Sequence, residues 1–219
     1  MKFTKTLLTT ALFSLSVFST TQIAYANSAQ ETQFQQGVEA YERSDFATAL
    51  QLWKPLAEQG YAEAQFNLAL MYHNGQGVKQ DYFQAFKWYQ KAAAQGYVDA
   101  QYNLGYMYYS GKGVKQDYFQ AFKWYQKAAE QGDVQAQAVL GYMYYNGKGV
   151  KQDYFQAFKW YQKAAEQGVA DAQVNLGAMY TLGQGVKKDR NLAKMWTGKG
   201  CDNGNQKGCK LYRKLNERK

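Results

Sequence analysis

A block of 17 residues, GVKQDYFQAFKWYQKAA, occurs three times without a single change, beginning at Gly77, Gly113 and Gly149. The copies are 36 residues apart, so the chain repeats one supersecondary unit. A unit of this length cannot bury its apolar face alone, and several copies must stack to form a continuous core. The repeat therefore predicts one elongated domain of stacked units.

Each unit has the pattern of two helices joined by a glycine loop. In the second unit the first helix has apolar residues at helical spacing and ends at the loop Gly111-Lys112-Gly113-Val114. Asp117 is placed to cap the second helix, since its carboxylate can accept from free backbone N–H groups. The apolar positions of the two helices are Ala100, Leu104, Met107 and Tyr108, then Ala121, Trp124, Tyr125, Ala128 and Ala129.

The glycine loops also contain a G-x-G pattern, as at Gly75-Gln76-Gly77. A phosphate-binding loop needs a preceding strand and a longer motif, and the chain has neither. We therefore expect a turn that needs unusual backbone dihedrals. The sequence predicts no cofactor.

The N-terminus is typical of a secretory signal peptide over residues 1–26. Lys2 and Lys5 precede an apolar run that ends at Phe18, and Ala24-Tyr25-Ala26 follows as a cleavage site. A membrane anchor is the alternative, but the run is shorter than the roughly 20 apolar residues of a span. We expect cleavage after Ala26, a periplasmic or secreted protein, and no transmembrane segment after cleavage.

Positive charge is concentrated at the C-terminal end. Residues 27–186 hold 13 basic and 14 acidic side chains, whereas residues 187–219 hold 11 basic and three acidic ones. One interpretation is a charged terminal unit that keeps the open end of the stack soluble. The other is docking on an anionic envelope surface or acidic partner. The export signal argues against nucleic acid as a partner. The docking contacts would be Lys187, Lys188, Arg190, Arg213, Lys214, Arg218 and Lys219.

The segment AQYNLGYMYYSGKGVKQDYFQAFKWYQKAAEQG, from Ala100, resembles the Sel-one-like repeat, a relative of the tetratricopeptide repeat. This resemblance implies an all-α fold, a right-handed α-solenoid of antiparallel helix pairs. The shorter loop of residues 27–60 resembles a tetratricopeptide unit instead. The expected divisions are a signal peptide (1–26), a tetratricopeptide-like helix pair (27–60), four 36-residue repeats within 61–204 (61–96, 97–132, 133–168 and 169–204) and a basic capping helix (205–219).

The first helices of the units differ, although the second helices are nearly identical. The variable positions have spacings of four and three, which places them on one helix face. In related solenoids the first helices line the concave side, so the resemblance makes this stripe a candidate groove for a peptide or protein. Neutral drift is the alternative, but tyrosine is typical of recognition surfaces. The candidate binding residues are Phe66, Asn67, Leu70, His73, Tyr102, Asn103, Tyr106, Tyr109, Tyr142, Tyr145 and Asn175.

Cys201 and Cys209 suggest a second resemblance. Their spacing is similar to that of the Hcp proteins, cysteine-rich Sel-one-like solenoids of bacterial envelopes, and implies a disulfide between the end of one helix and the start of the next. An oxidising compartment would permit this bond. A zinc site is the alternative, but the two cysteines have no nearby histidine, so no metal site is expected.

The Hcp resemblance also implies a possible β-lactam-binding or weak β-lactamase activity. The sequence lacks the Ser-x-x-Lys, Ser-Asp-Asn and Lys-Thr-Gly motifs of serine β-lactamases. His73 is the only histidine, so a histidine-rich zinc hydrolase site cannot form. We therefore assign no catalytic residue and expect a binding scaffold rather than an enzyme.

Overall fold

The computed structural model describes residues 28–217 of the chain. The expected signal peptide, residues 1–26, lies outside the described residues, as do the last two residues of the expected capping helix. Within the described part, every regular element is a helix. The expectation of an all-α fold is confirmed.

The helices alternate between a first and a second helix of each unit. A helix over residues 28–42 and α2 (Phe46–Glu58) form the N-terminal pair. Short turns then connect the following helices in order. These are α3 (Ala62–Asn74), α4 (Tyr82–Ala94), α5 (Val98–Ser110), α6 (Tyr118–Glu130), α7 (Val134–Asn146), α8 (Tyr154–Glu166), α9 (Ala170–Leu182), α10 (Arg190–Asp202) and α11 (Gln206–Glu217).

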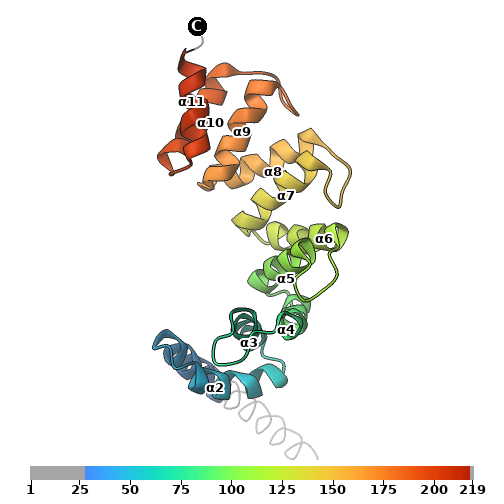
Figure 1. Cartoon of the computed structure of the whole chain (residues 1–219), viewed down its shortest axis with the longest axis vertical. Helices are drawn as coiled ribbons and strands as arrows, with labels where there is room; N and C mark the ends of the chain where they lie inside the picture. Colours follow the sequence, from blue (N-terminus) through green and yellow to red (C-terminus); the bar gives the residue numbers. More distant parts are fainter. Residues whose placement is uncertain (1–27, 218–219) are drawn as a thin grey trace, which may run out of the picture.

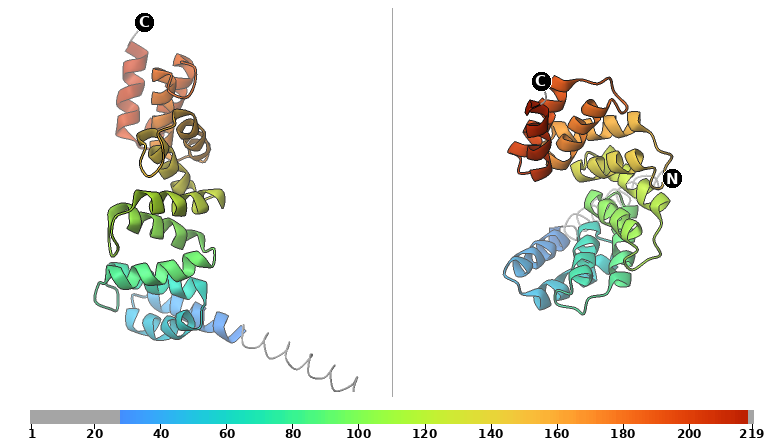
Figure 2. Two further views of the ribbon diagram at one scale, coloured as in Figure 1. Left: turned by 90° about the vertical axis from the view of Figure 1, so that its right-hand side faces the viewer. Right: turned by 45° about the horizontal axis from the view of Figure 1, so that its top comes forward.

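The helix pairs stack in chain order from α2 at one end to α11 at the other (Figure 1). Each helix packs mainly on its neighbours in sequence, and contacts between α7 and α9 or α9 and α11 are sparse. The stack curves around an open centre (Figure 2). The molecule is a right-handed α-solenoid of antiparallel helix pairs, as expected.

The core is a series of similar clusters built from alanine, leucine, methionine and one large aromatic residue per unit. In the second repeat Ala100, Leu104 and Met107 of α5 are fully buried, and Tyr125 of α6 is 2% exposed. Alanine lets the helices approach closely, and the aromatic ring fills the wider gap. The expected apolar positions are thus core, although Tyr108 and Trp124 are only partly buried.

A ladder of buried glutamines joins consecutive units. Gln137 of α7 donates from Nε2 to the Ala129 carbonyl at 3.3 Å and accepts from Gln167 Nε2 at 2.8 Å. It therefore links the second helix of the preceding unit to that of its own unit. Gln65, Gln101 and Gln173 make the equivalent contacts.

The helix ends follow the expected chemistry. The Asp117 carboxylate accepts from the backbone N–H groups of Phe119 and Gln120, both at 3.0 Å, which confirms the predicted cap. Gly111 and Gly113 have φ of +75° and +70°, the left-handed region that favours glycine. The glycine loops are therefore turns of the expected kind.

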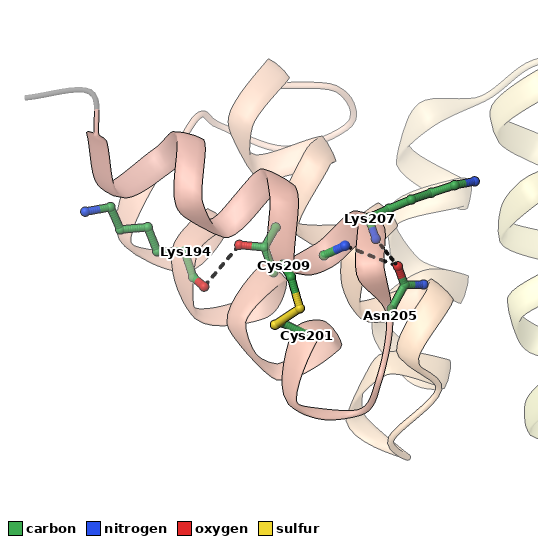
Figure 3. The surroundings of a disulfide bond; sticks show 7 residues. Lys194, Cys201, Asn205, Lys207 and Cys209 are labelled. Atoms are coloured by element: carbon green, nitrogen blue, oxygen red, sulfur yellow. Dashed lines mark hydrogen bonds between the residues drawn. A yellow bond between two sulfur atoms is a disulfide. The ribbon is translucent and has the colours of Figure 1, made fainter.

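A disulfide joins α10 to α11 at the C-terminal end. Cys201 near the end of α10 is bonded to Cys209 in the first turn of α11 (Figure 3). The Asn205 side chain between them accepts from the backbone N–H of Lys207 and of Gly208 at 2.9 and 3.1 Å, so it caps α11. The structure thus places the pair where the Hcp resemblance implied it.

Candidate functional site

A hollow of about 540 Å³ runs along the first helices of three repeats. It extends from α5 across α7 and α9 to the start of α11. Five of the expected binding residues line it, namely Tyr102, Tyr106, Tyr109, Tyr142 and Asn175. We refer to this hollow as the concave groove.

Differences in side-chain size along the variable stripe open the groove. Tyr102 of α5 is followed one repeat later by Ala138 of α7, and then by Val174 of α9. The smaller side chains leave space, and all three residues line the hollow. Variation between units therefore gives the groove its shape.

The floor of the groove is made by second-helix tyrosines that lie against glycine. A Cβ atom on Gly141 of α7 would lie 2.6 Å from the Tyr161 ring. Tyr125 lies against Gly105 in the same way and contacts Tyr102 at 5.5 Å between ring centroids. Burial raises the pKa of Tyr125 and Tyr161 well above the ordinary value, so both phenols are neutral at physiological pH.

Lys148 organises the tyrosines at one side of the groove. Its ammonium group donates to the Tyr109 hydroxyl at 3.0 Å and lies 5.1–5.5 Å from the ring centroids of Tyr109, Tyr118 and Tyr142. The hydrogen bond with Tyr109 raises the pKa of Lys148. The Tyr109 hydroxyl, and then Lys148, lower the pKa of Tyr142, whereas burial raises that of Tyr109. This cluster presents a fixed positive charge beside polar phenol groups.

The opposite end of the groove is polar and comes from α9 and α11. Asp171 accepts a hydrogen bond from the Asn205 amide, and Asn175 and Lys207 lie beside them. The binding residues expected from the sequence do not include Asp171, Asn205 or Lys207. A signal for Asp171 existed, because Glu63, Asp99 and Gln135 show that this first-helix position also varies. The other two lie outside the repeat comparison.

Several expected binding residues lie elsewhere. Phe66 and Leu70 pack against the core cluster between α4 and α5, where the Phe66 ring lies 5.8 Å from Tyr89 of its own unit and 5.0 Å from Tyr97 of the next. Tyr145 contacts Tyr154 at 5.1 Å and donates to Gln184 Oε1 at 2.8 Å, which ties it to the following loop. These three side chains serve packing between units rather than the hollow.

The remaining expected residues lie near the concave face but not in the hollow. Asn67 is partly buried on α3, and Asn103 donates to the Asp99 carbonyl at 2.8 Å. His73 lies edge-on to the Tyr82 ring at 5.1 Å. Burial, and then the charge of Lys112, lower the pKa of His73, so it is neutral at pH 7.

In the described part of the chain, one of the expected docking side chains at the basic C-terminal end is hydrogen-bonded to its own chain; Arg218 and Lys219 lie outside the described residues. Arg190 donates from Nη2 to the Leu215 carbonyl at 2.7 Å and so binds the last turn of α11.

Within residues 28–217 no cluster of three or more histidine, cysteine or acidic side chains is placed to hold a metal ion. Among the described helices, none is long and apolar enough to cross a membrane.

A model of the Sel1 repeat matches five consecutive segments of the chain, residues 24–61, 62–97, 98–133, 134–169 and 170–205. The chain belongs to the Sel1 repeat family. The first match covers the helix pair expected to be tetratricopeptide-like. Each of the other four matches begins and ends one residue later than the expected repeat. Sel1 repeat proteins are generally scaffolds for protein–protein interaction and typically not enzymes.

Solved Sel1 repeat structures are similar to this chain. A protective antigen of uropathogenic Escherichia coli, displaying an SLR fold, is 38% identical with a TM-score of 0.82 over 89% of this chain and 43% of the antigen. A Sel1 repeat protein from Oxalobacter formigenes is 40% identical with a TM-score of 0.76 over 83% of this chain and 74% of that protein. The chain therefore spans less than half of the antigen structure. No curated protein matches the chain.

Proposed function

We propose that this Sel1 repeat protein is an exported bacterial scaffold that binds a peptide or protein segment in the concave groove. The observation that carries the proposal is the convergence of four tyrosines and Asn175, from three different units, on one hollow. Tyr106 and Tyr142 are 36% and 39% exposed, so their rings are available to a ligand. Tyrosine offers a large contact area with a polar tip at low entropic cost.

The groove also contains groups that can bind an extended backbone. Asn175 carries an amide with both donor and acceptor atoms, and the tyrosine hydroxyls add further partners. Asp171 lines the groove and Lys148 is bonded to the lining residue Tyr109, so opposite charges lie at separate points beside the groove. A segment bound here would be fixed in direction by these charges, and the unequal units would set its sequence preference.

The export part of the proposal rests on the N-terminal sequence and on the disulfide. Cys201–Cys209 is a bond that persists in the periplasm or outside the cell. The partner would therefore be an envelope or extracellular protein. β-Lactam binding and docking through the basic end remain hypotheses from the sequence, and no contact in the groove favours either.

The test is site-specific photo-crosslinking in cells that produce the protein. A photoreactive phenylalanine analogue replaces Tyr106 or Tyr142 in the groove and, as a control, Leu182, which is 54% exposed outside the groove lining. We expect the same partner from both groove positions and not from Leu182. The double variant Tyr106→Ala, Tyr142→Ala should weaken that partner's binding at least about tenfold, as for two interface hot spots. Equal crosslinking at all three positions would contradict the proposal.

A further inference from the structure

Three second helices expose the same aromatic side chain. Phe83, Phe119 and Phe155 are the second residues of α4, α6 and α8, and they are 53%, 54% and 53% exposed. A lysine four residues later places its ammonium group over each ring, at 4.2, 4.3 and 4.3 Å from the centroid. We call these side chains the outer ridge: Phe83, Lys87, Phe119, Lys123, Phe155 and Lys159.

Packing does not account for the outer ridge. The three phenylalanines belong to none of the core clusters and leave half of their surface in water. The flanking units have no aromatic residue there, since Ala47 and Asn191 are the second residues of α2 and α10. Exposed apolar groups that recur in a regular array mark interaction surfaces.

Comparison of the copies also points to a constraint on this surface. The first helices of the three units have diverged at positions such as Phe66, Tyr102 and Ala138. The second helices are identical over their first twelve residues, exposed positions included, and differ only at the last residue, which is alanine in α4 and glutamate in α6 and α8. Core packing constrains only the buried face of a second helix. The sequence of the exposed face is therefore constrained by something other than core packing.

The chemistry of the outer ridge fits a ligand with negative charges. Helix α4 contains Lys87 and Lys91 and no acidic residue, and Lys91 lies 3.9 Å from the Trp88 ring centroid. The nearby Asp81 carboxylate is occupied by the backbone N–H groups of Phe83 and Gln84. Glu130 and Glu166, at the far ends of α6 and α8, each accept from a glutamine one turn earlier. An aromatic face beside an ammonium group offers both an apolar surface and a positive charge.

We propose that the outer ridge binds a linear anionic polysaccharide. Identical sites at equal steps fit a ligand that repeats one chemical group, whereas a protein segment presents different side chains at each step. Apolar C–H faces of sugar rings would stack on the phenylalanines, and carboxylate groups would pair with the lysines. Because the stack curves, α4, α6 and α8 face different directions, which a flexible chain can follow and a flat bilayer cannot (Figure 2).

The proposal is independent of the concave groove, and calorimetry with polygalacturonate as the probe tests it. The wild-type protein should bind long polygalacturonate at least about tenfold more tightly than the trisaccharide, because three linked sites act together. Raising the salt concentration should weaken this binding, and neutral dextran should not bind.

Two triple variants and one control assign the site. Each triple variant should reduce polygalacturonate affinity at least about tenfold. The first combines Phe83→Ala, Phe119→Ala and Phe155→Ala, and the second combines Lys87→Gln, Lys123→Gln and Lys159→Gln. The lysine variant keeps all three phenylalanine rings, so it stays informative if loss of the rings lowers stability. The groove variant Tyr106→Ala, Tyr142→Ala should bind like wild type. Circular dichroism and thermal melting check that each variant is folded.

Three results would overturn the proposal. These are no wild-type binding to polygalacturonate, a lysine variant that binds within twofold of wild type, or a groove variant that loses as much affinity as the ridge variants. Vesicles containing phosphatidylglycerol form a further arm. Vesicle binding that depends on the three phenylalanines, with polygalacturonate binding unchanged in the same variant, would assign the ridge to a membrane surface instead.

Discussion

Gly149 shows how a single loop residue sets the distance between units. Its φ is +68°, and a Cβ atom there would collide with the Tyr118 carbonyl oxygen of the preceding unit. Gly168 also has a positive φ, +91°, but nothing lies within 4 Å of its Cβ position. We expect Gly168→Ala to lower the free energy of unfolding by about 1–2 kcal/mol through backbone strain alone. Gly149→Ala should lower it by about 3–4 kcal/mol in urea unfolding. Equal losses would show that the close approach is unimportant.

His73 gives the stability of the protein a pH dependence. Burial, and then Lys112, hold the pKa of His73 below that of an unfolded histidine, which is about 6.5. The unfolded state therefore binds more protons in this range, and the contribution of His73 is complete above pH 6.5 and lost as the pH falls through the folded pKa. We expect the melting temperature to fall more between pH 7.5 and pH 5 in wild type than in His73→Tyr. This variant carries the residue of the next two units, Tyr109 and Tyr145. Identical falls would exclude His73 as the cause.

At the scale of elements, the glutamine ladder connects helices that hydrophobic packing alone would leave free to slide. Gln137 is 5% exposed and bonded at both ends of its amide. Gln137→Leu keeps the volume but removes two hydrogen bonds, after which the Ala129 carbonyl still accepts from the Gly132 N–H and the Gln167 amide still donates to the Lys163 carbonyl. We expect a loss of about 1–3 kcal/mol in the free energy of unfolding. Gln90→Leu, at an exposed position of α4, is the control and should change stability by less than about 0.5 kcal/mol. A smaller loss for Gln137→Leu than for the control would contradict this role.

At the scale of elements, some features of the structure could be predicted from the sequence and others could not. The unit length, the caps such as Asp117 and the positive-φ glycines follow from local rules, so they could be predicted. The contacts of side chains at equivalent repeat positions could not be predicted, because they depend on residues from another unit. Tyr109 bonds to Lys148 and Tyr145 to Gln184 at the equivalent loop position, but the hollow is lined by Tyr109 and not by Tyr145. Phe66 and Tyr102 share a repeat position and both contact a buried second-helix tyrosine, but the hollow is lined by Tyr102 and not by Phe66.

At the scale of the whole molecule, stability is a sum over units and their junctions. Deletion of residues 133–168 removes one complete repeat and should leave a folded protein, because Gln101 and Gln173 keep their ladder positions. We expect the urea m-value to fall by roughly a fifth, in proportion to the surface buried. The groove loses Tyr142, so binding of the proposed peptide should fall in parallel.

The matched control removes half a repeat. Deletion of residues 151–168 takes out α8 alone and leaves the apolar face of α7 without its outer partner. This variant should lose cooperative unfolding by circular dichroism. If both deletions behaved alike, the 36-residue unit would not be the structural module.

Because each helix packs mainly on its neighbours in sequence, the junctions between units can bend independently and their small rotations add along the stack. Compliance adds along such a chain, so a small rotation at each junction becomes a large displacement between α2 and α11. No single hinge is needed for the two ends to move apart or together. The width of the groove and the spacing of the units on the convex side are then coupled, since bending that narrows the concave side spreads the convex side. A ligand held on one face would set the fit of a ligand on the other.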